Sequence, residues 1–464
     1  MTDDLAYISI AEAGRRIAAR ELSPVDLTDA MIARAAAIDG ALGSFVTRTD
    51  ALARSQAEAA AAEIAAGQYK GPLHGIPIAL KEAFETAGIR TTVGSKLLRD
   101  NVPTRDATAW TRLRDAGAIL LGKLETTEFC YGGPSDDSLF RPARNPWNHA
   151  CYAGGSSSGA GVALASGQIL GALGTDTGGS IRLPAAYCGI TGLMPSYGLV
   201  SRAGVFPLSA TLDHVGPMAR SVEDCAILLN ALAGHDAADP GSVAQARPDY
   251  TANLGDGAKG LRIGLAGSLA QDDAVSPEGI AAYRAAAATF RDLGATVRDV
   301  DLPPFDDFAT AQIVITIVEG YALHERDLRD RREDYSYHTR MRLSLGPFIR
   351  AVDYARALRL RESLIAHYVA AMRDIDVLLA PGAPGAAPKA ASVGAFQFFK
   401  KPLVTMPANV LGVPALGIPA GMSSDGLPLA VQLMGKRYDD ATVLRAGAAF
   451  QAATAWHMAR PPVG

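Results

Sequence analysis

The feature that most constrains the fold is a segment rich in glycine and serine at residues 151–201, which reads CYAGGSSSGAGVALASGQILGALGTDTGGSIRLPAAYCGITGLMPSYGLVS. Glycine and serine are too frequent here for the interior of a helix or strand, yet apolar runs flank the segment. A water-exposed Gly/Ser linker would lack such flanks. Glycines let consecutive backbone N–H groups approach one point, as an anion or oxyanion site requires. We therefore expect ordered loops around a site.

Short apolar runs bounded by turn residues alternate with apolar residues at helical spacing. The runs predict strands at residues 76–80, 118–121, 169–173, 261–265, 377–379, 415–418 and 429–433. The helical spacing predicts helices at 51–66, 106–116, 221–232, 277–293 and 351–371, and one that begins after Ser23 with Pro24 in its first turn. Strands that alternate with helices form a sheet covered on both faces. The expected fold class is therefore α/β.

The length of 464 residues allows two or three domains or one large α/β unit. We expect a single domain over residues 1–464. Its expected parts are an N-terminal helical layer (1–70), a core (71–235), a divergent pocket region (236–400) and a C-terminal return to the core (401–464). Two stretches rich in glycine and proline, 236–260 and 381–391, could be linkers, but we favour surface loops.

The charge balance offers no stripe that could neutralise several phosphates. Lys and Arg number 44 against 48 Asp and Glu, and the densest basic cluster, at 326–332, is interrupted by acids. The N-terminus lacks the features of a secretory signal, and no apolar run approaches about 18 residues. We expect no direct nucleic-acid ligand, no membrane span and a cytoplasmic location.

The four cysteines are dispersed, at Cys130, Cys151, Cys188 and Cys225. No CxxC pair is present and no histidine stands at metal-ligand spacing, so we interpret them as reduced, mostly buried thiols. No ligand set or phosphate loop predicts a bound group. We expect neither a metal nor another cofactor.

The letters GGSSSG at 154–159 are a weak signal when taken alone. A Walker A loop is excluded because no Gly-Lys-Ser/Thr follows the glycines. A Rossmann fingerprint is excluded because GxGxxG and its acidic partner are missing. A nucleophile elbow matches in letters only, without an evident strand–turn–helix or a partner histidine.

Three motifs together are far more specific: PLHGIPIALKEAFETAGIRTT at 72–92, GGSSSG at 154–159 and GTDTGGSIRLPAAYCGITGL at 174–193. Their combination closely resembles the amidase signature family, whose members are hydrolases with a Ser–Ser–Lys triad. The resemblance covers nearly the whole chain and is weakest at residues 236–399. It implies a large, mixed, twisted β-sheet covered by helices on both faces.

Carried over residue by residue, the resemblance assigns the nucleophile to Ser180, the bridging serine to Ser156 and the catalytic lysine to Lys81. These residue types suit the chemistry, because a serine hydroxyl is a weak nucleophile that needs a base. A lysine can be that base when burial favours its neutral form. Lys81 follows the apolar run 76–80, where the end of a strand would hold it rigidly, and the adjacent Glu82 should point away from it.

The resemblance also implies an oxyanion hole and substrate contacts. The backbone N–H groups of Thr177, Gly178, Gly179 and Ser180 would form the oxyanion hole. The loop around Tyr131 and Gly132 would contact the substrate.

Residues near the motifs receive structural interpretations. We favour an ion pair or backbone hydrogen bonds for Asp176 and Arg182, and scaffold roles for His74 and His214. The chain departs from the common family pattern at positions that include Asp136, Asp137, Ser158, Ala160 and Met194. The Asp137 change could alter the polarity of the acyl pocket.

The divergent region is expected to form the pocket walls. The candidates are the helix at 353–371 and the loop at 393–402, which contains Phe396, Phe398 and Phe399. These aromatic side chains are either a lid over an apolar acyl group or part of a core cluster, and the sequence leaves both open.

The leading functional hypothesis is a free-standing amidase that cleaves a small or aryl amide to an acid plus ammonia or an amine. Its partners would be the small substrate and at most a second copy in a homodimer. The alternative is the A-type component of glutamyl-tRNA(Gln) amidotransferase, a glutaminase that feeds ammonia to a partner and resembles the chain in the same motifs. A catalytically inert assembly component is disfavoured because Lys81, Ser156 and Ser180 are all present.

Overall fold

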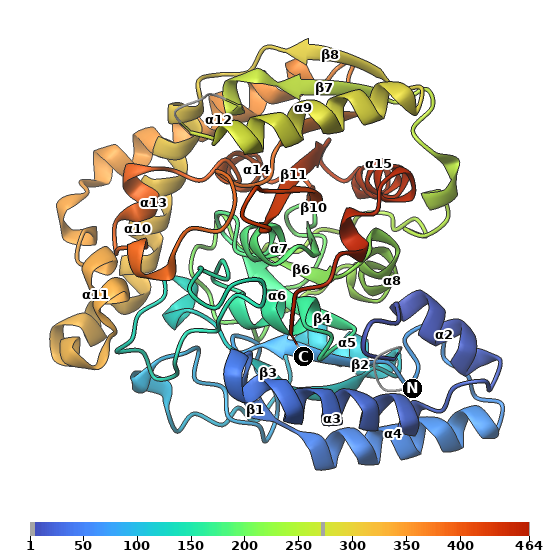
Figure 1. Ribbon diagram of the computed structural model, residues 1–464. Helices are drawn as coiled ribbons and strands as arrows, with labels where there is room; N and C mark the ends of the chain where they lie inside the picture. The colour runs from blue at the N-terminus through green and yellow to red at the C-terminus, as the bar shows by residue number, and fades with distance from the viewer. Residues whose placement is uncertain (1–4, 271–273, 464) are drawn as a thin grey trace.

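One mixed β-sheet organises the molecule. The computed structural model describes residues 5–270 and 274–463. Within these residues eleven strands pair in the order β1-β3-β2-β4-β6-β5-β10-β11-β9-β7-β8. Helices cover both faces of the sheet (Figure 1). The predicted α/β class and the large mixed sheet are confirmed.

The strands are short and several have glycine or proline within them. They are β1 (Phe45–Arg48), β2 (Pro77–Lys81), β3 (Ile119–Leu124), β4 (Gly171–Asp176), β5 (Thr191–Met194), β6 (His214–Ala219), β7 (Arg262–Ala266), β8 (Thr296–Val300), β9 (Val377–Pro381), β10 (Ala415–Met422) and β11 (Pro428–Gly435).

The helices vary widely in length. They are α2 (Ile10–Ala18), α3 (Pro24–Leu42), α4 (Asp50–Ala65), α5 (Thr108–Asp115), α6 (Ser158–Ala165), α7 (Arg182–Cys188), α8 (Val222–Leu232), α9 (Pro277–Asp292), α10 (Phe305–Asp330), α11 (Tyr337–Leu343), α12 (Ala351–Ala371), α13 (Gln397–Lys400), α14 (Met406–Leu411) and α15 (Asp440–Ala453).

All seven predicted strands are present, as β2, β3, β4, β7, β9, β10 and β11. Four strands have no counterpart in the prediction, namely β1, β5, β6 and β8. Their sequences explain the omission, because β6 (HVGPMA) contains glycine and proline and β8 (TVRDV) is mostly exposed. The predicted cap of α3 is confirmed, since the Ser23 side chain accepts a hydrogen bond from the Val25 N–H.

Two parallel strand pairs determine where a site can lie. β2 runs parallel to β3 and to β4, with Ile78 opposite Gly171 and Leu80 opposite Leu173. The carboxyl ends of β2 and β4 therefore meet at one edge of the sheet, where ligands bind in open α/β sheets. β2 ends at Lys81 and β4 ends at Asp176, so the predicted motifs begin at this edge.

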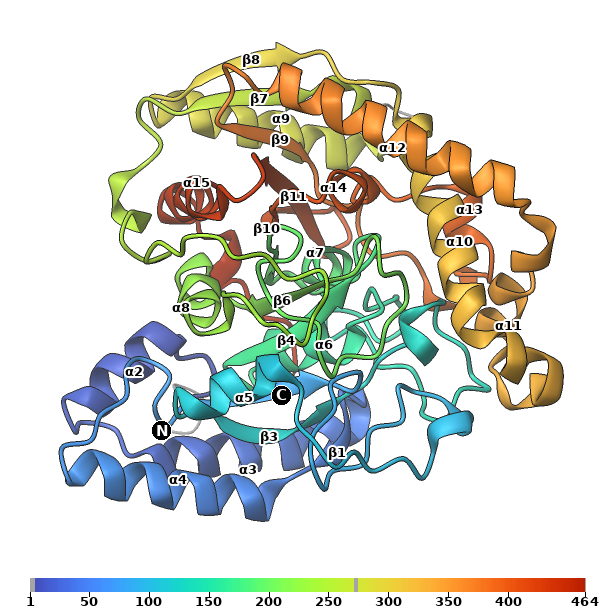
Figure 2. The same ribbon diagram turned by 180° about the vertical axis from the view of Figure 1, so that it is seen from behind.

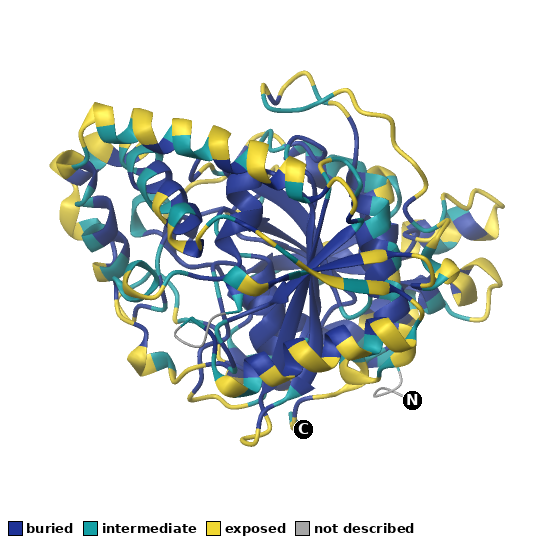
Figure 3. Cartoon of the chain, turned by 90° about the horizontal axis from the view of Figure 1, so that it is seen from above, coloured by how far each residue is buried: buried dark blue, intermediate teal, exposed yellow. Residues whose placement is uncertain are grey.

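The helices form layers of different origin. α3 and α4 pack on the part of the sheet that contains β2 and β3, while α9 and α15 pack on β9, β10 and β11. α10, α11 and α12 extend along one flank, where α10 packs on α12 and α14 (Figure 2). Seen from above, the strands are buried and the outer faces of the helices are exposed (Figure 3). Among the described helices none is both long and apolar enough to span a membrane.

An aromatic contact joins two of the helices that cover the C-terminal half of the sheet. Phe290 of α9 and Phe450 of α15 are both buried, and their ring centroids are 5.7 Å apart. A large buried side chain contributes transfer free energy and also fills volume that would otherwise be a cavity.

We expect Phe450→Ala to lower the free energy of unfolding by about 3 to 5 kcal/mol, because the cavity it leaves can collapse only partly. Urea unfolding followed by circular dichroism measures the change. Val369→Ala is the matched control, since Val369 is 65% exposed on α12 and surface truncations change stability little. Equal effects of the two substitutions would contradict the packing described here.

Candidate active site

Lys81 is the last residue of β2 and its side chain is fully buried. Its Nζ donates hydrogen bonds to Ser156 Oγ and to Thr175 Oγ1, both at 2.6 Å. No ion pair joins Lys81 to an acid among the residues described. The lysine is thus held between two hydroxyl groups. Thr175 was not predicted from the sequence, and its only signal is its place near the end of β4, the strand beside β2.

Ser156 lies in the loop before α6, where glycines are required for space. A Cβ on Gly154, whose φ is +81°, would come within 2.5 Å of the Pro184 backbone. A Cβ on Gly155 would overlap Tyr152 Oη. The close packing expected of the Gly/Ser segment is therefore present around Ser156.

Ser180 lies in the turn between β4 and α7, beside a glycine that a larger residue could not replace without strain. Gly179 has φ +128°, and a Cβ there would overlap Thr405 Oγ1. Thr405 Oγ1 donates to the carbonyl oxygen of Gly178 at 2.7 Å. The Ser157 N–H donates to the carbonyl oxygen of Ser180 at 3.2 Å, which ties the two serine loops together.

The predicted site residues other than Lys81 line one cavity. Its lining includes Tyr131, Gly132, Ser156, Thr177, Gly178, Gly179 and Ser180, together with Cys130, Gly155, Leu208, Gln312, Thr316, Arg342, Phe398, Phe399, Leu403 and Met406. Lys81 reaches this cavity through its hydrogen bond to Ser156. The fold therefore assembles residues that are up to 99 positions apart in the sequence, as the interval from 81 to 180 shows.

Asp176 and Arg182 form a fully buried ion pair beneath the turn, as the sequence led us to favour. Arg182 Nη2 lies 3.0 Å from Asp176 Oδ1, which also accepts from the Gly179 N–H at 2.7 Å. Of the four amides predicted to form the oxyanion hole, the Gly179 N–H is therefore occupied. The amides of Thr177, Gly178 and Ser180 are the better candidates.

The histidines and Glu82 take the places expected of scaffold residues. His214 Nδ1 contacts the Leu212 carbonyl oxygen at 2.8 Å, and burial lowers the pKa of His214 to about 4. Burial also lowers the pKa of His74, which contacts Glu63 on the N-terminal layer. Glu82 points away from Lys81 and accepts hydrogen bonds from Thr92 and Gly94.

Arg342 of α11 is a cavity residue that the sequence did not lead us to predict. It is buried, and its Nε donates to the Ala395 carbonyl oxygen at 2.5 Å. Tyr131 lies next to it, with the guanidinium carbon 5.7 Å from the ring centroid. Tyr131 Oη and Arg342 Nη2 are both buried without a hydrogen-bond partner among the described residues. The arginine was missed because it lies in a polar, charge-rich stretch with no motif.

The pocket walls differ in part from the prediction. Phe398 and Phe399 do line the cavity, and Phe396 lies near Phe399 with ring centroids 6.1 Å apart. The helix predicted at 353–371 does not contribute to the lining among the described residues. Its place is taken by Gln312 and Thr316 of α10, the helix against which α12 packs.

Four of the departures from the family pattern have structural partners or lie outside the cavity. Asp137 accepts from Ser135 Oγ and from the Tyr337 N–H at 2.9 Å, which fixes the start of α11. Asp136 lines a separate cavity nearby. The Ser158 side chain hydrogen-bonds to Glu125, and burial raises the pKa of Glu125 to about 7. Met194 Sδ accepts from Asn409 Nδ2 at 3.1 Å.

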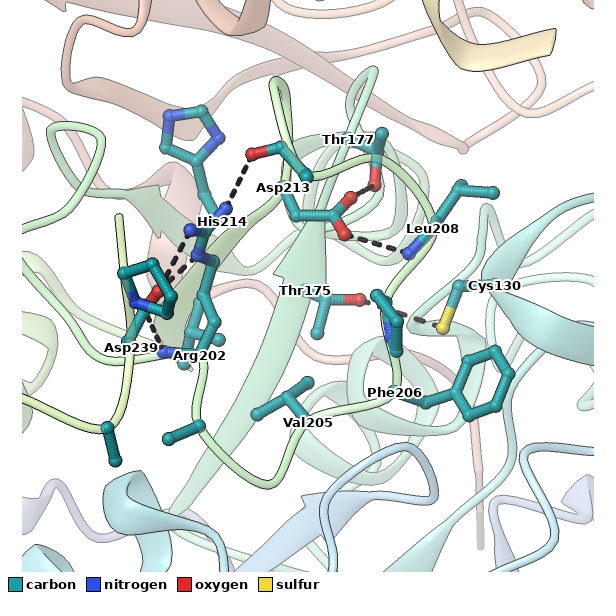
Figure 4. Close-up of a pocket in the computed structure, with 16 residues that line it drawn as sticks. Cys130, Thr175, Thr177, Arg202, Val205, Phe206, Leu208, Asp213, His214 and Asp239 are labelled. Atoms are coloured by element: carbon teal, nitrogen blue, oxygen red, sulfur yellow. Dashed lines mark hydrogen bonds and ion pairs between the residues drawn. The ribbon is translucent and has the colours of Figure 1, made fainter. Parts of the chain in front are cut away.

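A second cavity adjoins the first and shares Cys130, Thr177 and Leu208 with it. Figure 4 shows its polar side, where Asp213 accepts from Thr177 Oγ1 at 2.6 Å and from the Leu208 N–H at 2.8 Å. Neither Ser156 nor Ser180 lines it. Within the described ranges no group of three or more His, Cys, Asp or Glu side chains is placed to hold a metal ion.

Comparison with known proteins identifies the family. The sequence model of the Amidase family matches residues 26–444. The chain belongs to the amidase signature family. It is accordingly an enzyme that acts on the C–N bonds of amides.

Three relatives illustrate the range of this family. The A-type component of glutamyl-tRNA(Gln) amidotransferase from Geobacter metallireducens is 39% identical over 480 residues, which cover 98% of this chain and 99% of the relative. A solved chain from a vestigial protein complex, which reveals the evolutionary origins of an s-triazine catabolic enzyme, has a TM-score of 0.90 at 36% identity and covers 96% of this chain and 98% of its own. The peptide amidase of Stenotrophomonas maltophilia has a TM-score of 0.87 at 32% identity, with 98% of each chain covered.

The expectation that this amidase has only a small substrate and at most a second copy of itself as partners is wrong. The Geobacter relative is one component of an amidotransferase, and the solved chain from the triazine system belongs to a protein complex. The sequence motifs could not reveal this, because they build the hydrolytic site and not the surface that a partner contacts.

The ion pair between Asp176 and Arg182 yields a prediction about stability. Burial acts to raise the pKa of Asp176, but the charge and hydrogen bonds of Arg182 outweigh it and hold that pKa well below its usual range. The pair therefore stabilises the fold above the unfolded-state pKa of about 4, and this contribution is lost as the pH falls below it.

We expect Asp176→Asn to lower the free energy of unfolding by about 3 to 5 kcal/mol at pH 7, because Arg182 is left buried without its partner. Urea unfolding at several pH values is the measurement, and the difference from wild type should shrink toward acid pH. The control is Asp353→Asn, which breaks the exposed pair of Asp353 with Arg350 and should change little. A difference that grows toward acid pH would count against this account.

Proposed function

We propose that the chain hydrolyses the carboxamide bond of a small substrate through an acyl-enzyme on Ser180, and that it does so as the hydrolytic component of a protein complex. The observation that carries the proposal is the distance of 2.6 Å between Lys81 Nζ and Ser156 Oγ. Ser156 lines the same cavity as Ser180, so one hydroxyl connects the buried amine to the nucleophile. A buried ammonium without a carboxylate partner is costly, which favours the neutral amine that a base requires.

In the acylation step, Ser180 Oγ attacks the carbonyl carbon of the substrate. The Ser180 proton passes to Ser156 Oγ, and the Ser156 proton passes to Lys81 Nζ. A C–O bond forms and the carbonyl π electrons move to the oxygen, which the amides of Thr177, Gly178 and Ser180 would receive. The C–N bond then breaks, the proton returns along the same path to the leaving nitrogen, and ammonia or an amine departs.

In the deacylation step, water attacks the ester on Ser180. Its proton follows the path through Ser156 to Lys81, and the C–O bond to Ser180 breaks as Ser180 Oγ regains a proton. The products are the free carboxylic acid and the original hydroxyl groups. Lys81, Ser156 and Ser180 supply the proton acceptors and donors of this cycle.

Membership in a complex is proposed from the relatives. The Geobacter relative is 39% identical over nearly its whole length and is named as one component of an amidotransferase. A second candidate function follows from that name, in which the chain is the glutaminase of an amidotransferase and passes ammonia to its partner. Both candidates use the same chemistry at Ser180 and differ in the substrate and in the fate of ammonia.

We expect a sulfonyl fluoride to modify Ser180 alone, because Ser180 is the proposed nucleophile and has the relay beside it. Mass spectrometry of proteolytic fragments locates the adduct, and loss of amidase activity should follow its formation. An adduct on Ser156 or Ser158 would overturn the assignment.

Lys81 variants provide the control for this experiment. Lys81→Ala removes the proposed base and Lys81→Arg retains a charge but cannot release a proton at ordinary pH. Both should slow labelling and lower kcat/KM by about 10² to 10⁴. Lys70→Ala, on the surface near the N-terminal layer, should label at the wild-type rate.

We also expect the tagged chain, when purified from the cells that naturally produce it, to carry a second protein in fixed stoichiometry. Mass photometry and peptide sequencing would identify the pair, and kcat/KM for a panel of amides would be compared with that of the chain alone. Glutaminase activity present only in the complex would favour the second candidate. A chain that purifies alone with full activity would contradict the proposed complex.

A further inference from the structure

Arg342 is a buried cation whose charge has no acidic partner within the described part of the chain. The residue is only 4% exposed. Nε donates to the Ala395 carbonyl oxygen at 2.5 Å, while Nη2 has no partner among the described residues. No Asp or Glu of residues 5–270 and 274–463 forms an ion pair with it. Buried charges in proteins are paired or bind a ligand.

Aromatic rings surround the guanidinium instead of carboxylates. Its central carbon lies 5.4 Å from the ring centroid of Phe398, 5.5 Å from that of Phe399 and 5.7 Å from that of Tyr131. Burial acts to lower the pKa of Arg342, yet arginine stays protonated in proteins. Cation–π contacts offset part of the cost of removing this charge from water. They leave in-plane hydrogen-bond donors available to an anion.

The acids closest to the cavity are engaged elsewhere. Asp176 pairs with Arg182, and Glu128 accepts hydrogen bonds from Ser95 Oγ and from Ser336. Asp213 accepts from Thr177 and from two backbone amides on the side of the second cavity. Among the described residues, the lining of the first cavity therefore contains one cation and no carboxylate.

We propose that Arg342 binds the carboxylate of the substrate, and that the substrate is a small monoamide of a dicarboxylic acid without an ammonium group. The inference rests on the proposed function and defines its substrate class. Tyr131 Oη, which also has no partner among the described residues, is a second donor for the same carboxylate. An amino-acid amide such as glutamine brings the carboxylate but also an ammonium, for which the described lining offers no acid.

The first experiment compares matched substrates on the wild-type protein. Succinamate and butyramide differ by a carboxylate in place of a methyl group, and glutaramate and glutamine differ by an ammonium. Charge-assisted hydrogen bonds favour succinamate over butyramide in kcat/KM by about tenfold to hundredfold. Glutaramate should exceed glutamine by about tenfold, because the ammonium loses its hydration without gaining a partner. Equal rates within each pair would overturn the inference.

The second experiment assigns the preference to Arg342. Arg342→Met should reduce the ratio of kcat/KM for succinamate over butyramide to near one, mainly through KM, and Arg342→Lys should restore part of it. Arg340→Met is the matched control, because Arg340 lies on the same helix but pairs with Glu333 outside the cavity. It should retain the wild-type ratio. A ratio that falls equally in Arg340→Met and Arg342→Met would contradict a direct contact.

A binding measurement separates this inference from the proposed catalysis. Succinate, the expected product, needs no turnover to bind, so calorimetry can be done with wild type, Arg342→Met and Arg340→Met. Succinate binding to wild type and Arg340→Met that is lost in Arg342→Met supports the carboxylate site even if Ser180 fails to label. Equal binding to all three proteins, or none to wild type, overturns the site whether or not amides are hydrolysed.

Discussion

The buried ion pair of Asp176 and Arg182 is the interaction on which the geometry of the site depends. Asp176 is the last residue of β4, and its carboxylate accepts hydrogen bonds from the Gly179 and Ile181 amides at 2.7 and 3.1 Å. Arg182 is the first residue of α7 and donates to the Thr405 carbonyl oxygen and to Gln432 Oε1, both at 2.8 Å. One charge pair therefore joins β4, the Ser180 turn, α7, β11 and the segment before α14. A buried pair with saturated hydrogen bonds holds such a turn in a single conformation.

Two buried lysines near this edge show why the surroundings of a residue matter more than its type. Lys123 of β3 donates to the Phe84 carbonyl oxygen at 2.5 Å and to Thr86 and Thr91, and burial lowers its pKa to about 8. A carbonyl oxygen can only accept, so it requires a donor from the lysine. The acceptors of Lys81 are two hydroxyl groups, which can accept from an ammonium or donate to a neutral amine. Of the two lysines, Lys81 is therefore the one that can change its protonation without breaking its contacts.

The sequence predicts the parts of the fold where pattern and environment agree. The strands β2, β4 and β10 are apolar runs in fully or almost fully buried positions, and such runs are recognisable without the structure. β5 (TGLM) and β6 (HVGPMA) are buried as well, but glycine, proline and histidine conceal them. Their strand conformation comes from pairing with neighbours, which a local pattern does not contain. The single-domain organisation stays a prediction.

For the site, the motifs located Ser156, Ser180 and Lys81, because glycines that avoid a clash leave a conspicuous local pattern. Thr175 and Arg342 leave no such pattern, since their significance comes only from what surrounds them in three dimensions. Arg342 lies on α11, whose start is fixed by Asp137, a residue that departs from the common family pattern. The divergent region thus supplies the charged wall of the cavity, while the core supplies the proposed hydroxyl relay. Specificity can change in such an arrangement without disturbing the relay, because the two sets of residues share a cavity but few contacts.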